Sequence, residues 1–218
     1  MARVLERRKR HAEESHMSEK VLSRLRWYLT ALESFQSEGV GSVSSWQLAE
    51  RVGVNAALIR KDLSKFGEFG TPSSGYRIDY LYDRIKDILH LGVRRSIVWV
   101  GACTFAKQEP RLNRLERQGM HVAAVFDSDA GEIGKHIGDY EVQPVSAMES
   151  VLASVRPCIA VISLSGSEAQ QAAEIAARHG VKAVLNLSGA LLLLPKRVRV
   201  CSIDILGEIM ELCYYCDV

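Results

Sequence analysis

Residues 45–66 read SWQLAERVGVNAALIRKDLSKF, and this stretch decides the fold of the first half of the chain. It places Ala49, Gly53 and Ile59 at offsets of four and six residues, which is the spacing of a helix-turn-helix. Two helices can cross closely at a residue as small as Ala49, and Gly53 can adopt the positive φ of the turn at the least cost. The stretch therefore predicts two short helices that meet at Gly53.

The second of these helices, from Asn55 to about Phe66, has a cationic outer face. Asn55 is a good N-cap because its side chain can accept a hydrogen bond from the first turn. Lys and Arg on such a helix can enter the major groove of DNA and neutralise phosphates, while serines at the start of the preceding helix bind phosphate. The residues that we expect to contact DNA are Ser44, Ser45, Asn55, Arg60, Lys61, Ser64, Lys65, Gly75 and Tyr76.

Residues 66–78 follow directly and are rich in glycine and turn residues between aromatic residues, which predicts a β-hairpin. A helix-turn-helix with such a hairpin is a winged helix, and we expect this domain to cover residues 17–92. The hairpin tip, residues 71–74, carries no basic side chain. A small helical bundle with solvated lysines and arginines remains the alternative interpretation.

Charge is unevenly distributed along the 218 residues, although the net charge is only +2. Residues 1–95 hold 17 Lys and Arg against 12 Asp and Glu, whereas residues 96–218 hold 11 against 14. A basic first part indicates a polyanionic partner. Residues 1–16 are predicted to be a flexible basic extension. Neither a signal peptide nor an apolar run long enough to span a bilayer is present, so we expect a cytoplasmic protein without membrane contacts.

The second half alternates apolar strands with helical segments. Strands are predicted at residues 96–101, 121–127, 158–163 and 183–187, and helices near residues 105–118, 146–154 and 167–179. Near-continuous apolar strands separated by helices are typical of a parallel sheet that is covered on both faces. The sequence therefore predicts an α/β fold, in which a Rossmann-like doubly wound sheet over residues 93–203 follows the winged helix.

The first strand and helix of this half have the geometry of a dinucleotide-binding unit. The G-x-G-x-x-G pattern reads here as Gly101, Ala102, Cys103, Thr104, Phe105 and Ala106. Asp127 ends the next strand, near the distance expected of a ribose-binding acid that favours NAD. Cys103 weakens the pattern because the second glycine normally lets backbone approach pyrophosphate. We expect these seven residues and Ser163, where a later strand ends, to bind NAD(H).

The five cysteines, at positions 103, 158, 201, 213 and 216, are an odd number without a secretory signal, which indicates reduced thiols. Cys213 and Cys216 have no second pair or nearby histidine to complete a zinc site, and we interpret them as buried small residues on one helix face. Cys103 is interpreted as a buried cysteine that fills ligand space, with an oxidant-sensing thiol as the alternative. No metal site is expected.

The segment 59–70, IRKDLSKFGEFG, together with Gly75 and Tyr76, closely resembles the winged-helix signature of the Rex family of bacterial redox-sensing repressors. Residues 126–129 with Ile133 and Gly134 are similar to the family's second-strand segment, and residues 204–215 to its C-terminal helix. The resemblance covers about residues 17–216. It departs at Cys103 to Ala106, where the family usually continues its glycine-rich loop differently.

The resemblance implies a homodimer that binds palindromic operators and represses genes of fermentation and anaerobic respiration. It also implies that NADH releases the protein from DNA while NAD+ permits binding. The C-terminal helix, residues 204–218, would be exchanged between subunits as a dimerisation helix.

Two alternatives to a repressor that senses NADH/NAD+ remain open. The first is a DNA-binding paralogue that has lost NAD(H) binding, as Cys103 and the Glu109–Pro110 pair in the following helix would allow. The second is a small NAD- or CoA-dependent enzyme. No spacing of His, Cys, Asp or Glu suggests a catalytic constellation, so we expect no catalytic residues and no enzyme.

Overall fold

A computed structural model of the chain describes residues 19–67, 69 and 75–216. The chain divides into two compact units, one ending at Leu91 and the other beginning at Gly92. The predicted extension, residues 1–16, and the predicted wing tip, residues 71–74, lie outside the described residues.

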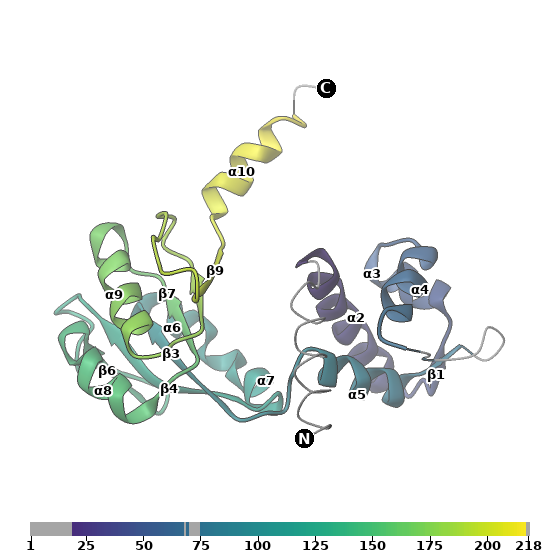
Figure 1. Ribbon diagram of the computed structural model, residues 1–218, viewed down its shortest axis with the longest axis horizontal. Coiled ribbons are helices and arrows are strands. Elements are labelled where there is room, and N and C mark those ends of the chain that lie inside the picture. The colour runs from purple at the N-terminus through teal and green to yellow at the C-terminus, as the bar shows by residue number, and fades with distance from the viewer. Residues whose placement is uncertain (1–18, 68, 70–74, 217–218) are drawn as a thin grey trace, which may run out of the picture. The chain divides into compact units, whose positions relative to one another are not determined.

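The first unit is a helical domain that forms around one apolar core (Figure 1). Helix α2, Glu19–Ser37, supplies the longest apolar stripe, with Leu25 and Leu32 fully buried. Helix α5, Ile78–Ile88, packs along α2 and buries its own apolar face. The helix-turn-helix therefore rests on a base of two helices rather than on its own small core.

The helix-turn-helix forms as the sequence predicts. Helix α3, Ser45–Val52, begins at a capping box in which the Ser44 hydroxyl accepts the Gln47 amide and the Gln47 side chain accepts the Ser44 amide. It ends at Gly53, whose φ of 74° lies in the left-handed region. Helix α4, Ala56–Ser64, is shorter than predicted and begins after Asn55, whose side chain accepts the Ala57 amide at 2.7 Å.

A two-stranded ladder joins both ends of the helix-turn-helix. Strand β1, Ser42–Val43, pairs antiparallel with β2, Tyr76–Arg77, so that Val43 lies opposite Tyr76. Gly75 precedes β2 with a φ of +69°, and a Cβ on it would strike the Val43 carbonyl oxygen. This pairing spans the whole motif and was not predicted, because the sequence pattern indicated pairing only within residues 66–78.

The second unit is built on a seven-stranded sheet with the order β5-β6-β4-β3-β7-β8-β9 (Figure 1). The four predicted strands are β3, Arg95–Val100, β4, Met120–Asp127, β7, Ile159–Ile162, and β8, Ala183–Asn186. Three further strands are β5, His136–Ile137, β6, Tyr140–Pro144, and β9, Arg199–Ser202. All neighbouring strands run parallel except β5, which is antiparallel to β6. The strand order reverses direction between β3 and β7, where doubly wound sheets bind ligands.

Helices cover both faces of this sheet, as predicted (Figure 1). Val98 and Val100 of β3 face α8, Met148–Val155, and α9, Gly166–Arg178. Ile97 and Trp99 face the opposite side, which is covered by α6, Ala102–Gln108, and α7, Leu112–Arg117. Short 3-10 turns, Glu109–Arg111 (η1) and Val145–Ala147 (η2), complete the connections.

The helix predicted near residues 105–118 is divided into α6, Ala102–Gln108, and α7, Leu112–Arg117, by η1. Pro110 lies in this turn, where it has no backbone N–H to donate to the preceding helix. Helix α6 therefore has only seven residues.

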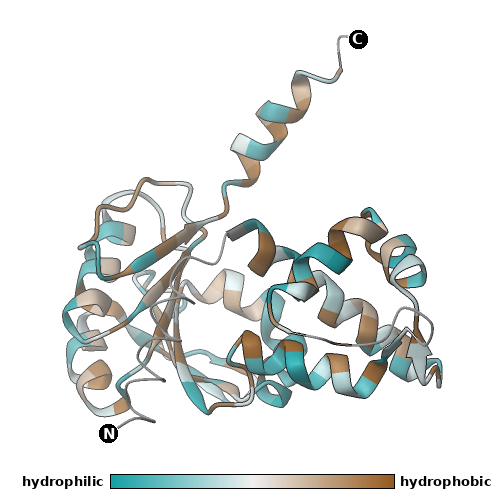
Figure 2. Ribbon diagram, turned by 45° about the vertical axis from the view of Figure 1, so that its right-hand side comes forward, coloured by the Kyte–Doolittle hydropathy of each residue, from teal (hydrophilic) through white to brown (hydrophobic). Residues whose placement is uncertain are grey.

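The chain ends in α10, Ile205–Cys213, which alternates apolar and polar residues along its length (Figure 2). None of its residues is buried within the single chain, and Leu206, Met210 and Leu212 are among its large exposed apolar side chains. Cys213 and Cys216 are exposed as well, so their interpretation as buried residues is wrong within one chain. No helix in the described part of the chain is long and apolar enough to cross a membrane.

Candidate functional site

Helix α4 separates its buried face cleanly from its exposed face. Ile59, Asp62 and Leu63 are buried against the core. The four residues predicted to face DNA from this helix, Arg60, Lys61, Ser64 and Lys65, are all exposed. The exposed face therefore carries three cationic side chains and one hydroxyl, as the 3.6-residue helical period requires.

A buried ion pair holds α4 on α2. Arg24 of α2 donates from Nε and Nη2 to the two carboxylate oxygens of Asp62, at 2.6 and 2.8 Å. The Tyr28 hydroxyl donates to the same carboxylate at 3.0 Å. Asp62 is only 1% exposed, so it needs these three bonds to stay charged. The bidentate geometry fixes the rotation of α4, and with it the direction of its cationic face.

This network shifts the pKa values of its members. Burial alone would raise the pKa of Asp62, but the hydrogen bonds from Arg24 and Tyr28 outweigh burial and leave that pKa below its usual value. Burial, together with the hydrogen bond to Asp62, raises the pKa of Tyr28 well above its ordinary range. The carboxylate therefore stays ionised and the phenol stays neutral at physiological pH.

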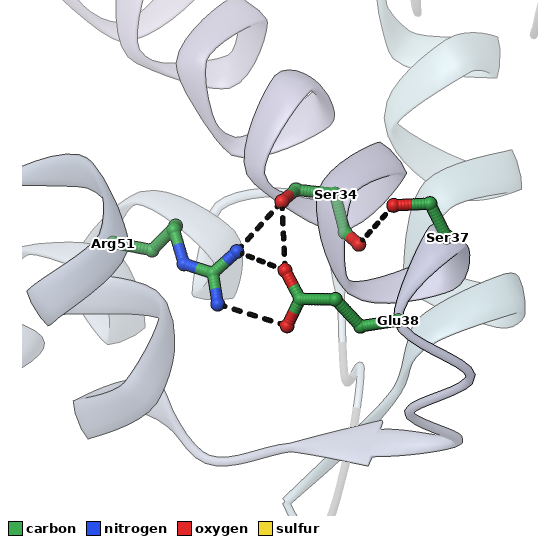
Figure 3. Close-up of polar contacts among 4 residues, drawn as sticks. All are labelled: Ser34, Ser37, Glu38 and Arg51. Carbon is green, nitrogen blue, oxygen red and sulfur yellow. Dashed lines mark hydrogen bonds and ion pairs between the residues drawn. The ribbon is translucent and has the colours of Figure 1, made fainter.

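A second set of polar contacts ties α3 to α2 (Figure 3). Arg51 donates to both carboxylate oxygens of Glu38, at 2.6 and 3.1 Å, and to the Ser34 hydroxyl at 2.7 Å. Its guanidinium also lies over the Phe35 ring, 4.1 Å from the centroid. Although the ion pair is exposed, its bidentate geometry helps to fix the orientation of α3 relative to α2.

The remaining predicted DNA contacts lie at the ends of these elements. Arg60 donates to the Ser45 hydroxyl at 2.8 Å, which joins the exposed face of α4 to the first turn of α3. The hydroxyl of Ser44 accepts an amide in the capping box and keeps its proton for an outside acceptor. Tyr76 is half-buried on β2, and burial raises its pKa. Six predicted contacts thus gather on α3, α4 and their caps, whereas Asn55 is the N-cap of α4, Gly75 directly precedes β2 and Tyr76 lies on β2.

In the second unit, the turn between β3 and α6 is tightly closed. Gly101 has a φ of 118°, and a Cβ at this position would overlap the Ser163 hydroxyl. That hydroxyl donates a hydrogen bond to the Val100 carbonyl oxygen at 2.9 Å. The hydroxyls of Thr104 and Ser163 are hydrogen-bonded to each other. The turn and the end of β7 are therefore joined by side chains at the point where the strand order reverses.

Asp127 lies at the end of β4, beside the start of α6. Its Oδ2 accepts the Ala102 amide at 2.6 Å, and its Oδ1 accepts the Asp129 amide at 2.9 Å. The side chain is 7% exposed. Because a carboxylate can accept about four hydrogen bonds, Asp127 retains acceptor capacity on each oxygen.

The glycine-rich segment divides between the core and the surface. Ala102 and Phe105 are fully buried, and the Phe105 ring packs edge-on against Trp99 and Tyr140. Cys103 is exposed in the first turn of α6, so its interpretation as a buried cysteine that fills ligand space is wrong. A side chain nevertheless stands where the glycine pattern would have none.

A cavity of about 490 Å³ borders α6 on the side of β8 and β9. Its lining includes Trp99, Thr104, Lys107, Ser188 and Asp204. Sequence reasoning missed this cavity because residues 187–189 and 203–206 carry no ligand-binding motif, and only the parallel pairing of β8 with β9 brings them together. Among the described residues, no group of three or more His, Cys, Asp or Glu side chains could hold a metal ion.

Comparison with known proteins bears on both units. The family model described as "Putative DNA-binding protein N-terminus" matches residues 16–64, and the "CoA binding domain" model matches residues 94–190. A protein of Chloroflexus aggregans named "Redox-sensing transcriptional repressor Rex" is 35% identical over 195 residues, which are 89% of this chain and 92% of the relative. This chain belongs to the Rex family.

A Rex protein of Brevibacillus brevis is 32% identical and aligns with 94% of this chain and 99% of its own length. Among solved structures, RSP in complex with β-NAD+ and operator DNA superposes with a TM-score of 0.83 at 28% identity, covering 92% of this chain and 93% of RSP. RSP in complex with β-NADH gives a TM-score of 0.80 at 27% identity, covering 93% and 95%. The predicted fold, a DNA-binding domain followed by a Rossmann-like parallel sheet, is confirmed.

Proposed function

We propose that this chain is a DNA-binding transcriptional repressor whose hold on its operator responds to the NADH/NAD+ ratio. The observation that carries this proposal is the exposed cationic face of α4, whose orientation the buried Asp62 network fixes. A rigid helix with Lys and Arg on one side is suited to the major groove. Membership of the Rex family, whose relative RSP was crystallised with operator DNA, NAD+ and NADH, supports the same function.

The DNA contacts divide into two kinds. Arg60, Lys61, Ser64 and Lys65 would approach base edges and phosphates from α4, whereas Ser44 and Ser45 would hold a phosphate at the start of α3. Asn55 lies at the leading end of α4. Gly75 and Tyr76 would bring the base of the wing to the flanking backbone. Base contacts would set the operator sequence, and phosphate contacts would set register and salt dependence.

Two features of the second unit support NAD(H) binding. Asp127 retains acceptor capacity for ribose hydroxyls, and the 490 Å³ cavity beside α6 has room for a ring and its sugar. The backbone of residues 101–106, together with Ser163, would face the pyrophosphate. Cys103 adds a side chain to this segment, so we propose binding that is weaker than a glycine at this position would allow. Bound NADH or NAD+ supplies the redox signal and undergoes no reaction here.

A second candidate function is a repressor that does not respond to NAD(H). Three observations favour it: the Cys103 side chain, the Asp127 carboxylate that already accepts two amides, and the bond between Thr104 and Ser163. Opening this turn for a dinucleotide would have to replace those contacts. Direct measurement of NADH binding decides between the two functions.

We also propose that the chain acts as a homodimer in which α10 is exchanged between subunits. The exposed apolar residues of α10 in a single chain need a cover, and a second copy of the chain is the partner that a palindromic operator requires. The NAD(H) response would then be a shift between two dimer geometries. Such a shift requires that the effector bind the two geometries with different affinity. The absence of an enzymatic activity and a cytoplasmic location remain predictions.

The proposed function is tested in two steps with the full chain. A pool of randomised duplexes is first enriched on the protein in the presence of NAD+, and the recovered sequence should be a palindrome. NADH is then titrated into the complex while fluorescence anisotropy follows the labelled duplex. Release by NADH supports the sensing repressor, release by neither nucleotide supports the second candidate, and failure to enrich any sequence would refute both.

A further inference from the structure

The first turn of α3 carries an exposed tryptophan, Trp46. Trp46 is 75% exposed, compared with 52% for Trp27 on α2. Single exposed apolar residues are common on protein surfaces, so exposure alone carries no argument. The position of Trp46 relative to the cationic face of α4 is what distinguishes it.

Helix α3 has three faces, and two of them are occupied. Leu48 and Ala49 are buried in the core. Arg51 is directed to α2, where it bonds to Glu38 and Ser34 (Figure 3). At 100° per residue, Trp46 and Glu50 project from the remaining face, away from the contacts with α2.

This third face adjoins the exposed face of α4. The 2.8 Å bond from Arg60 to the Ser45 hydroxyl brings the cationic side of α4 to the residue immediately before Trp46. Trp46 therefore lies at the margin of the surface that would meet DNA. In a groove-docked helix-turn-helix, the first helix of the motif crosses the sugar-phosphate backbone at this margin.

The chemistry of this turn suits a phosphodiester backbone. The capping box uses the amide of Gln47, and helix geometry leaves the amides of Ser45 and Trp46 without an intrahelical acceptor. An indole adds a flat apolar surface and one N–H donor. A DNA backbone offers the complementary pair, the apolar edge of deoxyribose beside a phosphate oxygen.

We propose that Trp46 is a DNA-backbone contact, in which the indole packs on a deoxyribose beside the half-site and Nε1–H donates to a phosphate. This inference rests on the proposed DNA binding. The contact positions the protein and carries no sequence information. Glu50, one turn later on the same face, is exposed and acidic, and it confines the approach of phosphates to the first turn of α3.

The experiment compares Trp46→Ala and Trp46→Phe with Trp27→Phe, which alters an exposed tryptophan on α2. Binding of the duplex recovered from the randomised pool is measured over a range of salt concentrations. We expect Trp46→Ala to weaken binding about tenfold and Trp46→Phe, which keeps the ring surface, about threefold. The slope of log affinity against log salt should stay unchanged, since no cation is lost. Trp27→Phe should bind as the unmodified protein does.

Tryptophan fluorescence gives a second readout that a structural role would not move. The duplex should quench emission of the unmodified protein and of Trp27→Phe, and should fail to quench Trp46→Phe. Unchanged thermal unfolding of the variants is expected because the side chain is exposed.

The inference is overturned if Trp46→Ala binds the duplex as tightly as the unmodified protein does, or if the duplex still quenches the fluorescence of Trp46→Phe. In either case the proposed DNA binding stands. A full chain that enriches no duplex overturns DNA binding and the inference with it. The two failures are therefore distinguishable.

Discussion

The exposed face of α4 and the turn between β3 and α6 respond differently to sequence change. The α4 face depends on side chains that project into solvent and on a buried ion pair that orients them. A dinucleotide-binding turn depends on close approach of backbone to the ligand, and here the Cys103 side chain occupies a position that the glycine pattern leaves without one. In this chain the α4 face keeps its cationic side chains, whereas the turn keeps its acid, Asp127, and has Cys103 and Ala106 in place of the second and third glycines.

This difference shows why the two functions of a ligand-responsive repressor can diverge. A cationic helix tolerates many substitutions because phosphate contacts are individually modest. A pyrophosphate-binding turn tolerates few, because one Cβ lies within contact distance of the ligand. The sensing unit is therefore the part of this molecule in which small changes should have the clearest consequences for regulation.

Removal of α10 should have the largest effect. A chain that stops at Asp204 lacks all the exposed apolar residues of α10, and we expect it to be monomeric in sedimentation experiments. A monomer reads one half-site, so affinity for the palindrome should fall by about a hundredfold or more. Leu206→Glu with Met210→Glu should act alike in the full-length chain, whereas Glu208→Gln should not. If the protein remained a dimer after both changes, α10 would not be required for dimerisation.

Asp62→Asn should destabilise the first unit by about 2 to 3 kcal/mol, because Arg24 loses the carboxylate that compensates its charge. Urea unfolding of the full chain measures this loss. The folded pKa of Asp62 is below its usual 3.8, so its contribution is present above that pH and is lost as pH falls through the folded value. The two proteins should therefore converge in stability only below about pH 3.8. A constant difference down to lower pH would contradict the ionised pair.

Lys61→Ala should weaken operator binding about tenfold and reduce the salt slope by about one. The reason is the loss of one cation from the exposed face of α4. Lys182→Ala, which removes an exposed lysine from the second unit, is the matched control and should change neither quantity. Equal effects from both lysines would mean that binding follows overall charge and not the α4 surface.

Cys103→Gly should strengthen NADH binding about fivefold, the smallest of these effects. It removes the side chain from the segment that would face pyrophosphate and leaves Asp127 in place. Isothermal titration calorimetry measures the change, with Cys201→Ser as a control at an exposed cysteine away from this turn. Cys103→Ala should fall between glycine and cysteine. An unchanged affinity would place the obstacle elsewhere, at Thr104 and Ser163.

Local signals in the sequence were sufficient for much of the fold. The two helices of the helix-turn-helix form as predicted, one over Ser45–Val52 and one after Asn55. Their capping residues and the turn glycine lie within a few residues of the helix ends, so the local sequence is enough to reveal them. The four central strands formed as predicted because they are apolar on both faces. The edge strands β5 and β9 and the neighbouring strand β6 were missed, since short, partly exposed strands have no continuous apolar run.

Contacts between distant residues were beyond prediction. The pairing of Arg24 with Asp62 joins residues 38 positions apart, and neither residue signals the other. The pairing of β1 with β2 depends on the tertiary packing of α3 and α4 between them. Cys103 is exposed because α6 begins directly after Gly101. The incomplete glycine pattern did not reveal where this helix begins.

The central claim is that operator binding by the first unit responds to NADH bound weakly by the second unit. The most direct test is to titrate NADH into the labelled operator complex of the unmodified protein and of Cys103→Gly in parallel. We predict that NADH releases both proteins from the duplex and that Cys103→Gly releases at a lower NADH concentration. Release of neither protein, with selective binding to the operator intact, would contradict the claim that the second unit still reads NADH.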